Sequence, residues 1–424
     1  MVIENVTCPA CGLLCDDLTI ETATDSAKDK LSVVKNGCHK SVVFFSRSAS
    51  PTSPRVDGKP ATMAQAITRS GEILRQAQMP LLGALATEVQ GMRAVMSLAD
   101  KAGATVDHMN SNNFMRNVQV VQNSGWQTTT LTEVRNRVDL LLVIGTDIVS
   151  TFPRFFERQI WNGETMFGQD TSKREIVYLG GDPDTTAGVA PDGRKPDVLP
   201  CAIVQLPEVI AVLRALVLGK RVVAHEVAGI AVADLEKLAA RLKAARYSVV
   251  TWAAATLDFE HAELTVQNIV ELVKTLNSTT RSSGLPLGGM DGEMNANQVA
   301  TWTSGYPMRS SYARSWPEHD AYHLSTDVLL QSGETDALLW VSTFNPDAPP
   351  PVTQTPTIAI GHPQMKLQRE PEVFIPVSVP GIDHQGIAFR MDNVVSLPLY
   401  QLRESTLPRL GEVLGEIEKT LKTN

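Results

Sequence analysis

The 424-residue chain is too long for one ordinary hydrophobic core, and we expect roughly two to four domains. Its 43% hydrophobic and 20% charged residues fit a soluble globular protein, and its net charge of −8 argues against a dedicated nucleic-acid surface, which needs clustered Lys and Arg. No apolar run of about 18 residues predicts a membrane span. The N-terminus has neither the basic nor the apolar region of a secretory signal, so we expect a cytoplasmic protein.

Four of the five cysteines lie within the first forty residues, at Cys8, Cys11, Cys15 and Cys38. In a reducing compartment this cluster favours a metal site over disulfides. Four thiolates suit a 4Fe–4S cube or a tetrahedral zinc ion, and the spacing leaves both open. The alternative is a set of thiols that no longer binds metal. The fifth cysteine, Cys201, lies in an apolar run and is predicted to be a core thiol.

The segment 48–60 is rich in Ser, Pro and Gly and predicts a linker after a Cys-rich domain at 1–55, which includes a polar, hairpin-like span. Helical and strand-like segments alternate from there on. Hydrophobic spacing predicts helices at 61–77, 88–103, 207–219, 232–245 and 262–278. Apolar runs predict strands at 80–86, 104–109, 138–147, 174–184, 247–256, 336–344, 355–362 and 372–380. This alternation predicts a multi-domain α/β fold with parallel sheets flanked by helices, divided at 56–190, 191–330 and 331–424.

In open α/β sheets, ligands bind beyond the carboxyl ends of the strands. One loop that follows a predicted strand carries Gly145, and a second carries Gly180, Gly181 and Asp182. Such residues are also typical of ordinary strand-to-helix turns. No dinucleotide fingerprint, phosphate-binding loop, zinc-protease or serine-hydrolase motif occurs. His319 and His323 have the spacing of two ligands on one helical face, but Pro317 and the lack of a third ligand favour a surface pair.

The segment CPACGLLCDD, together with Cys38, resembles the N-terminal iron–sulfur segment of molybdopterin oxidoreductases. It is most similar to that of the B subunit of tungsten- or molybdenum-dependent formylmethanofuran dehydrogenase. Four further stretches resemble the same subunit, at 125–154, 265–278, 284–307 and 381–394. The resemblance spans almost the whole chain and implies the fold of a pterin-dependent oxidoreductase.

In that family a cysteine ligates the tungsten or molybdenum, about a dozen residues before the glycine that matches Gly125. Counting back in this chain reaches Asn113, within Asn113-Phe114-Met115-Arg116-Asn117. A neutral carboxamide does not replace a soft thiolate ligand, and the neighbouring histidine is also absent. The resemblance therefore implies that no tungsten or molybdenum pterin is bound and that redox chemistry is lost. Six residues are predicted to form a relic of the cofactor cleft: Asn113, Arg116, Gly145, Gly180, Gly181 and Asp182, with Arg154 as another side chain for the vacated space.

The formyltransferase/hydrolase complex of methylotrophic bacteria resembles formylmethanofuran dehydrogenase but performs no redox step. Its D subunit moves a formyl group from formyl-tetrahydromethanopterin to a methanofuran-type carrier, and its A subunit releases formate. This chain resembles the B subunit, which implies a non-catalytic scaffold that meets the A and C subunits most closely. Two alternatives stay open: the B subunit of a redox-active tungsten or molybdenum formylmethanofuran dehydrogenase with an atypical metal ligand, and a free-standing module that binds a small anion.

Overall fold

The structure is a computed structural model that describes residues 1–22, 31–47 and 52–421. Its contacts group the chain into two compact units. Unit 1 comprises Met1–Asn112 and Gly289–Asn424, and unit 2 comprises Asn113–Gly288. This grouping differs from the consecutive segments expected from the sequence, because unit 1 is discontinuous: the chain leaves it after residue 112 and rejoins it at 289.

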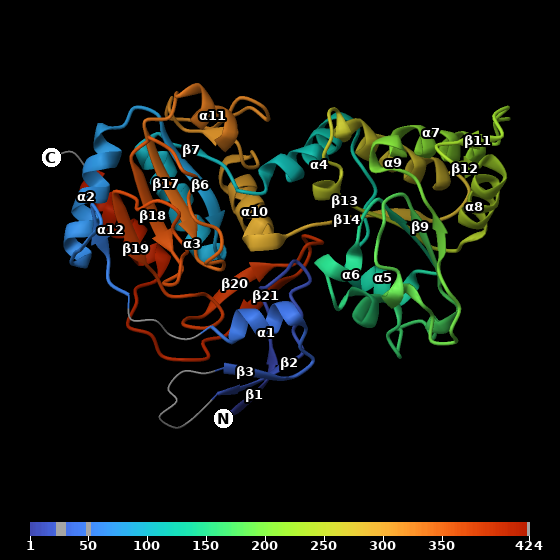
Figure 1. Ribbon diagram of the computed structural model, residues 1–424, viewed down its shortest axis with the longest axis horizontal. Helices are drawn as coiled ribbons and strands as arrows, with labels where there is room; N and C mark the ends of the chain where they lie inside the picture. The colour runs from blue at the N-terminus through green and yellow to red at the C-terminus, as the bar shows by residue number, and fades with distance from the viewer. Residues whose placement is uncertain (23–30, 48–51, 422–424) are drawn as a thin grey trace. The chain divides into compact units, whose positions relative to one another are not determined.

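Unit 1 contains a nine-stranded sheet in the order β16-β15-β7-β6-β17-β18-β19-β4-β5, whose run from β7 to β19 is parallel (Figure 1). The strands are β4 (Arg55–Val56), β5 (Lys59–Pro60), β6 (Pro80–Ala86), β7 (Thr105–Val106), β15 (Ser310–Ser311), β16 (Glu318–His319), β17 (Ala337–Ser342), β18 (Thr357–Gly361) and β19 (Val373–Pro376). Every residue of β6, β17, β18 and β19 is buried, which explains their unbroken apolar sequences.

The helices of unit 1 beyond residue 60 have caps supplied by the sequence at several of their ends. They are α2 (Met63–Gln76), α3 (Val89–Ala102), α10 (Glu293–Ser304), α11 (Thr326–Ser332) and α12 (Leu410–Leu421). Thr62 and Gln65 form a capping box at the start of α2, and Gly103 ends α3 at a φ of 64°. Helix α12 packs against α2 and α3, so the C-terminal helix joins two helices from the first quarter of the chain.

The cysteine-bearing N-terminal part of unit 1 has an antiparallel sheet and one short helix. The elements are β1 (Val2–Val6), β2 (Leu18–Thr22), β3 (Leu31–Lys35) and α1 (His39–Phe45). The expected hairpin-like span falls largely on residues 23–30, outside the described residues, as do 48–51 of the expected linker. The rest of that linker contains a hairpin, since Asp57 and Gly58 both take positive φ and connect β4 to β5, which pair antiparallel.

Unit 2 contains a five-stranded parallel sheet in the order β10-β9-β8-β13-β14. Its strands are β8 (Leu140–Ile144), β9 (Glu175–Leu179), β10 (Asp197–Leu199), β13 (Ser248–Ala253) and β14 (Ser282–Leu287). Its helices are α4 (Ser111–Ser124, which starts two residues before the unit boundary), α5 (Leu131–Arg137), α6 (Ile148–Thr151), α7 (Leu206–Val217), α8 (Val232–Ala244) and α9 (Ala262–Leu276). Leu, Ile and Val side chains from α7, α8 and α9 pack with β8 and β13 in one apolar core.

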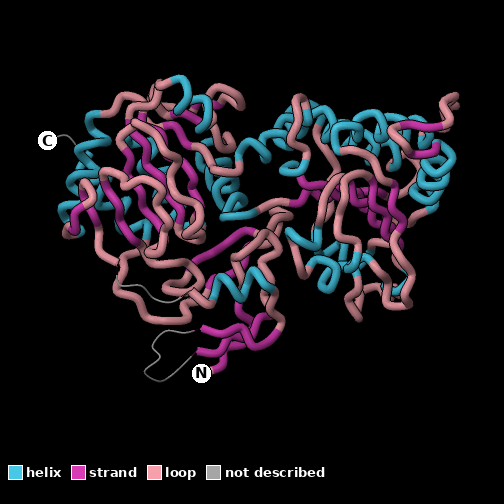
Figure 2. Tube along the Cα trace, in the orientation of Figure 1, coloured by secondary structure: helices cyan, strands magenta, loops and turns pink. Residues whose placement is uncertain are grey.

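Two small hairpins supply the remaining strands of the described residues (Figure 2). They are β11 (Glu226–Val227) with β12 (Ile230–Ala231), and β20 (Gly386–Phe389) with β21 (Ser396–Leu399). None of the helices within the described residues is long and apolar enough to cross a membrane. The predicted α/β class, with parallel sheets flanked by helices and a cysteine-bearing N-terminal part, is confirmed.

Candidate functional site

The carboxyl edge of the larger sheet has the topology of a ligand-binding crevice. From β6 the chain continues to β7 on one side, whereas β17, on the other side of β6, continues to β18 and β19. The direction of strand order therefore reverses between β6 and β17. Ligands in open parallel sheets bind at such a switch point.

The backbone is irregular where β6 reaches this edge. Ala84 and Leu85 have φ values of 62° and 55°, which are costly for residues with a side chain. The register with β17 shifts here, since Gly83 pairs with Trp340 and Ala86 with Ser342. This bulge redirects the chain into Thr87 and Glu88, which follow the strand.

A glycine-rich loop, 288–293, lies against the same edge. Asp291 and Gly292 have φ values of 52° and 74°, and a Cβ on Gly292 would lie 2.6 Å from the Thr87 carbonyl oxygen. Asn345, which follows β17, donates from Nδ2 to the Asp291 carboxylate at 3.2 Å. The loop thus contacts the segments after both strands of the switch point, and only glycine fits at 292.

His108, which follows β7, is a buried neutral imidazole beside this loop. Its Nδ1 accepts from the Asn110 amide at 3.0 Å, so its Nε2 carries the proton and donates to the Asp291 carbonyl oxygen at 3.2 Å. Burial lowers the pKa of His108 to about 4. The ring is held as a neutral donor at physiological pH.

Two carboxyl groups of the loop lie beside His108: Glu293 is buried, whereas Asp291 is partly buried. Burial raises the pKa of Glu293 to about 7, with Asp291 contributing in the same direction, although the Gly289 amide donates to Glu293 at 2.9 Å. Burial also raises the pKa of Asp291, against the opposing charges of Lys40 and Arg47. We call His108, Asp291 and Glu293 the acid–imidazole cluster. A carboxyl group that titrates near neutrality can hold or release a proton there.

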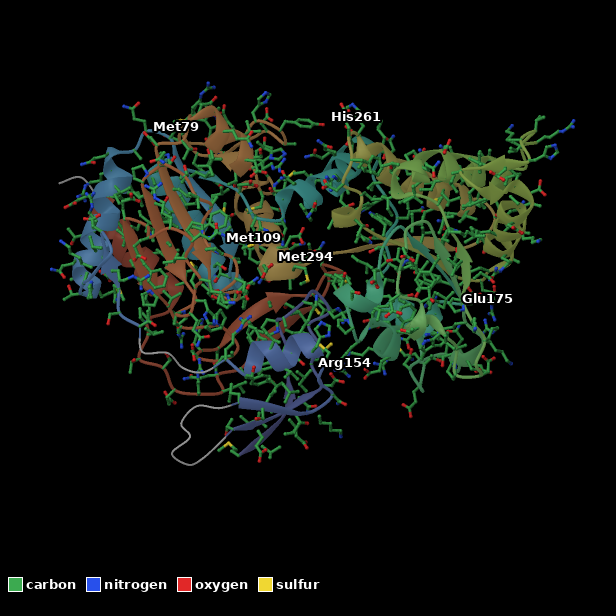
Figure 3. The ribbon with its side chains drawn as sticks, in the orientation of Figure 1. Met79, Met109, Arg154, Glu175, His261 and Met294 are labelled. Atoms are coloured by element: carbon green, nitrogen blue, oxygen red, sulfur yellow. The ribbon has the colours of Figure 1, made fainter. Side chains whose placement is uncertain are left out.

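The cysteine segment contacts this region through Gly12. A Cβ on Gly289 would lie 3.2 Å from Gly12 Cα, and the Met391 amide donates to the Gly12 carbonyl at 2.9 Å. Lys40 of α1 acts on the pKa of both Cys11 and Asp291, so its charge lies within range of the thiols and of the acid–imidazole cluster. Met294, labelled in Figure 3, follows Glu293 in the first turn of α10.

The four N-terminal thiols gather in one place. Cys8, Cys11 and Cys15 are buried and Cys38 is partly exposed. Burial raises the pKa of Cys8 well above its usual value, and the other three thiols raise it further. Four thiolate donors fit the chemistry of an iron–sulfur cube or zinc. Across the described residues, however, no three His, Cys, Asp or Glu side chains have the arrangement that a metal ion needs.

The carboxyl edge of the smaller sheet has the same topology, with its switch point between β8 and β13. The predicted glycines follow β8 and β9 there, but their amides are already used. Gly145 donates to Leu179, Gly180 to Leu199 and Gly181 to Cys201, each to the carbonyl at 2.9 Å. These amides are therefore not directed toward a phosphate.

Apolar side chains cover the space above these glycines. A Cβ on Gly145 or Gly180 would lie 2.7 Å from a methyl carbon of Leu206, and one on Gly181 would lie 3.2 Å from Ile203. Cys201, predicted to be a core thiol, is partly exposed and contacts the Gly180 position. The glycines permit close packing of 201–206 onto the strand ends.

Asn113 and Arg116, on α4, lie over the segment that follows β13. Arg116 donates to Asn113 Oδ1 at 3.1 Å and to the Ala254 carbonyl at 2.8 Å, and forms an ion pair with Asp258 at 2.7 Å. Leu257 of the same segment would lie 3.8 Å from a Cβ on Gly145. The predicted carboxamide is thus brought to the edge that carries the glycines.

The remaining predicted residues have other surroundings. Asp182 is exposed, and Arg154, labelled in Figure 3, is buried and pairs with Glu157 at 2.6 Å. His319 is in strand β16, and exposed His323 is in a turn, where it pairs with partly exposed Asp320. The two histidines do not share a helical face.

Known proteins resemble this chain over most of its length. No protein-family model matches. The B subunit of a tungsten-containing formylmethanofuran dehydrogenase 2 from Methanocaldococcus jannaschii is 27% identical, over 99% of each chain. The B subunit of the formyltransferase/hydrolase complex from Methylorubrum extorquens is 28% identical, over 77% of this chain and 85% of the relative.

A solved structure agrees with these sequence matches. The crystal structure of the Methylorubrum extorquens formyltransferase/hydrolase complex with methylofuran contains a chain that is 25% identical, with a TM-score of 0.75 over 87% of this chain and 98% of that one. The chain is a homologue of these B subunits.

The edge that carries Asn113 does not fit a pterin-held metal of the kind expected in the redox relatives. A metal there requires a soft ligand, whereas Asn113 offers a carboxamide oxygen that already accepts from Arg116. A pterin phosphate would need backbone donors, whereas the three glycine amides donate to carbonyls. We therefore derive no chemical step through such a cofactor.

The sequence pattern did not single out the acid–imidazole cluster. His108 is one of eight scattered histidines, and Asp291 and Glu293 lie within a stretch notable only for its resemblance. The glycine run GGMDG before a helical segment was the available signal, because repeated glycines predict positive φ at a close approach.

Proposed function

We propose that this chain is a non-redox structural subunit of a formyltransferase/hydrolase complex in the cytoplasm. In this role it carries no chemistry of its own and holds the A and C subunits together, with the D subunit in the same assembly. The complex converts formyl-tetrahydromethanopterin to formate through a methanofuran-type carrier. Support comes from the similarity to the B subunit and the chain of the Methylorubrum extorquens complex.

The observation that carries the non-redox part is the state of Asn113. The relative from Methanocaldococcus jannaschii is named as tungsten-containing, and the resemblance of this chain to that family implies a thiolate ligand at this position in the redox enzymes. In this chain the position holds a carboxamide, which accepts a hydrogen bond from Arg116. Arg116 is itself held by the Ala254 carbonyl and the Asp258 carboxylate. A hydrogen-bonded carboxamide is not the soft ligand that tungsten or molybdenum requires.

Elemental analysis of the complex purified from its host tests this proposal. We expect tungsten and molybdenum below about 0.1 atom per chain, and formyltransferase/hydrolase activity within about twofold of wild type in an Asn113→Ser variant. When this chain is deleted, the A and C subunits should no longer elute together in one size-exclusion peak. Stoichiometric tungsten or molybdenum with an organic pterin would instead support the alternative, the B subunit of a redox-active formylmethanofuran dehydrogenase, which the retained cysteines favour.

We further propose that the four cysteines hold one structural metal centre, either 4Fe–4S or zinc. Structural zinc contributes on the order of 10 kcal/mol in small domains, so Cys11→Ser should expose residues 1–50 to protease while the rest of the chain stays resistant. Cys201→Ser, which removes a thiol outside the cluster, is the matched control. Equal protease resistance of both variants would contradict metal binding at the cluster.

A further inference from the structure

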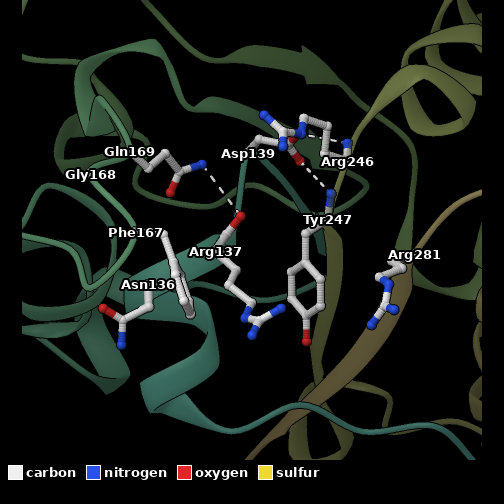
Figure 4. Close-up of a pocket in the computed structure, with 9 residues that line it drawn as sticks. All are labelled: Asn136, Arg137, Asp139, Phe167, Gly168, Gln169, Arg246, Tyr247 and Arg281. Carbon is white, nitrogen blue, oxygen red and sulfur yellow. Dashed lines mark hydrogen bonds between the residues drawn. The ribbon is translucent and has the colours of Figure 1, made fainter.

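Unit 2 has a pocket at the amino edge of its sheet, opposite the edge that carries Asn113 and the glycines. Its volume is about 470 Å³. Residues that precede β8, β13 and β14 form much of its wall, because the amino ends of parallel strands meet at one edge. The lining residues are Asn136, Arg137, Asp139, Phe167, Gly168, Gln169, Arg246, Tyr247 and Arg281 (Figure 4).

Three arginines supply the charge of this pocket. The guanidinium of Arg137 lies 4.6 Å from the centre of the Phe167 ring, and in Figure 4 it lies between that ring and Tyr247, with Arg281 on the far side of Tyr247. Arg246 enters from the start of β13. Three cations from three separate segments thus line one space.

The neutral and acidic groups of the wall are bound within the protein. The Asp139 carboxylate accepts from the Arg246 and Tyr247 amides at 2.7 and 3.0 Å. Gln169 donates to the Val138 carbonyl at 2.9 Å and accepts from Arg174 at 2.8 Å. These groups fix the wall and leave its guanidinium groups as the donors for a ligand.

Two of those guanidinium groups have no partner among the residues that the structure describes. Arg137 pairs with Glu133 at 2.7 Å, whereas no hydrogen bond or ion pair from the side chains of Arg246 or Arg281 reaches a described residue. The three arginines therefore have two carboxylates near them, Glu133 and Asp139, and Asp139 is bound to backbone amides. The pocket carries an excess of positive charge and of planar N–H donors.

We propose that this pocket binds the phosphate group of a small phosphate monoester. Guanidinium groups match the oxygens of phosphate with paired hydrogen bonds, and a monoester carries about −1.5 to −2 charges at pH 7, which balances Arg246 and Arg281. A pocket of this size holds more than a bare phosphate. Phe167, 60% exposed, offers an apolar surface for the rest of the ligand.

Calorimetric titration of the full chain tests the site with three probes at equal ionic strength: inorganic phosphate, phenyl phosphate and malonate. We expect saturable binding of phosphate, binding of phenyl phosphate at least threefold tighter, and binding of malonate at least fivefold weaker than phosphate. The variant R246Q/R281Q should weaken phosphate binding at least tenfold. Arg221→Gln removes the same kind of charge from the exposed loop after α7 and should leave binding unchanged.

The outcomes are decisive in both directions. Equal or tighter binding of malonate would overturn the phosphate assignment in favour of a dicarboxylate. No saturable binding to wild-type chain, or equal weakening by Arg221→Gln, would overturn the site itself. Because Arg246 and Arg281 are exposed, the double variant should keep the wild-type melting temperature within about 2 °C, which separates lost binding from lost folding. None of these outcomes depends on the proposed role in a complex.

Discussion

The two large sheets of this chain share a topology in their parallel parts and differ in what covers their carboxyl edges. Each has a switch point, between β6 and β17 in the larger sheet and between β8 and β13 in the smaller one. At the larger sheet the edge holds the acid–imidazole cluster with a strained, glycine-rich loop. At the smaller sheet the edge is closed by Leu206 and Ile203 over three glycines.

This difference shows that glycines after a strand have two opposite uses. Glycine lets a ligand approach the backbone, and it equally lets a protein side chain approach. At Gly145 and Gly180 the approaching group is Leu206, so the edge is part of the apolar core. At Gly292 the approaching group is the Thr87 carbonyl, and titratable groups lie beside it.

Removing the apolar cover of the smaller sheet should have the largest effect. Leu206 is fully buried, so Leu206→Ala loses transfer free energy and leaves a cavity. We expect the free energy of unfolding to fall by about 3 kcal/mol in urea denaturation. Leu264→Ala, at a position 55% exposed on α9, should change it by less than about 0.5 kcal/mol. Equal effects of the two variants would contradict close packing at this edge.

The acid–imidazole cluster should make the stability of the protein depend on pH. Glu293 has a folded pKa of about 7, above its ordinary value of 4.5. The folded state thus binds more protons between these values, and this stabilising contribution is fully present below pH 4.5 and is lost as pH rises to 7. Glu293→Gln removes this ionisation. The free energy of unfolding of the variant, relative to that of wild type, should therefore be higher at pH 8 than at pH 5 by about 2 kcal/mol.

Thermal melting of both proteins from pH 5 to 8 measures this difference. His108 contributes the opposite slope, because its pKa is lowered to about 4 and its stabilising contribution is lost as pH falls from 6.5. Subtracting the wild-type curve from the variant curve cancels that common term. A pH-independent difference would show that Glu293 does not titrate near neutrality.

The smallest effect is expected at the Arg116 contacts. Arg116→Met keeps the apolar stem but loses the hydrogen bonds to Asn113 and Ala254, which should lower the free energy of unfolding by about 1 kcal/mol. Asp258 is 84% exposed, so Asp258→Asn should cost less than about 0.5 kcal/mol. A larger loss in Asp258→Asn than in Arg116→Met would mean that the ion pair, and not the carbonyl contact, fixes Arg116.

Much of the secondary structure could be predicted from local pattern. The spacing in 61–77 and 88–103 predicts α2 and α3, and the apolar runs around 140–144 and 337–342 predict β8 and β17, because a strand buried on both faces must be apolar throughout. The hairpin β4–β5 falls in the segment predicted as a linker, although Asp57-Gly58 was the turn signal. Its short strands left too few residues for a periodic pattern.

The site was predicted only in part, for a physical reason. Asn113 and Arg116 were named from the sequence, and the structure joins them by a hydrogen bond, with Arg116 also bound to the segment after β13. Whether the amides of Gly180 and Gly181 were open or used depended on residues 199 and 201, which only the pairing of β9 and β10 brings to them. The three arginines of the amino-edge pocket are similarly far apart, at 137, 246 and 281, and no local pattern connects them.

The sequence by itself determined the α/β class, the cysteine cluster and the carboxamide at 113, because hydrophobic period and residue chemistry are local properties. Only the tertiary structure decided that the carboxyl edges of two sheets with one topology differ in character, since one is covered by apolar side chains and the other holds titratable groups. Burial sets both outcomes, since it lets Leu206 close one edge and shifts the pKa of Glu293 and His108 at the other. Burial is a property of the assembled chain, to which residues more than a hundred positions apart contribute.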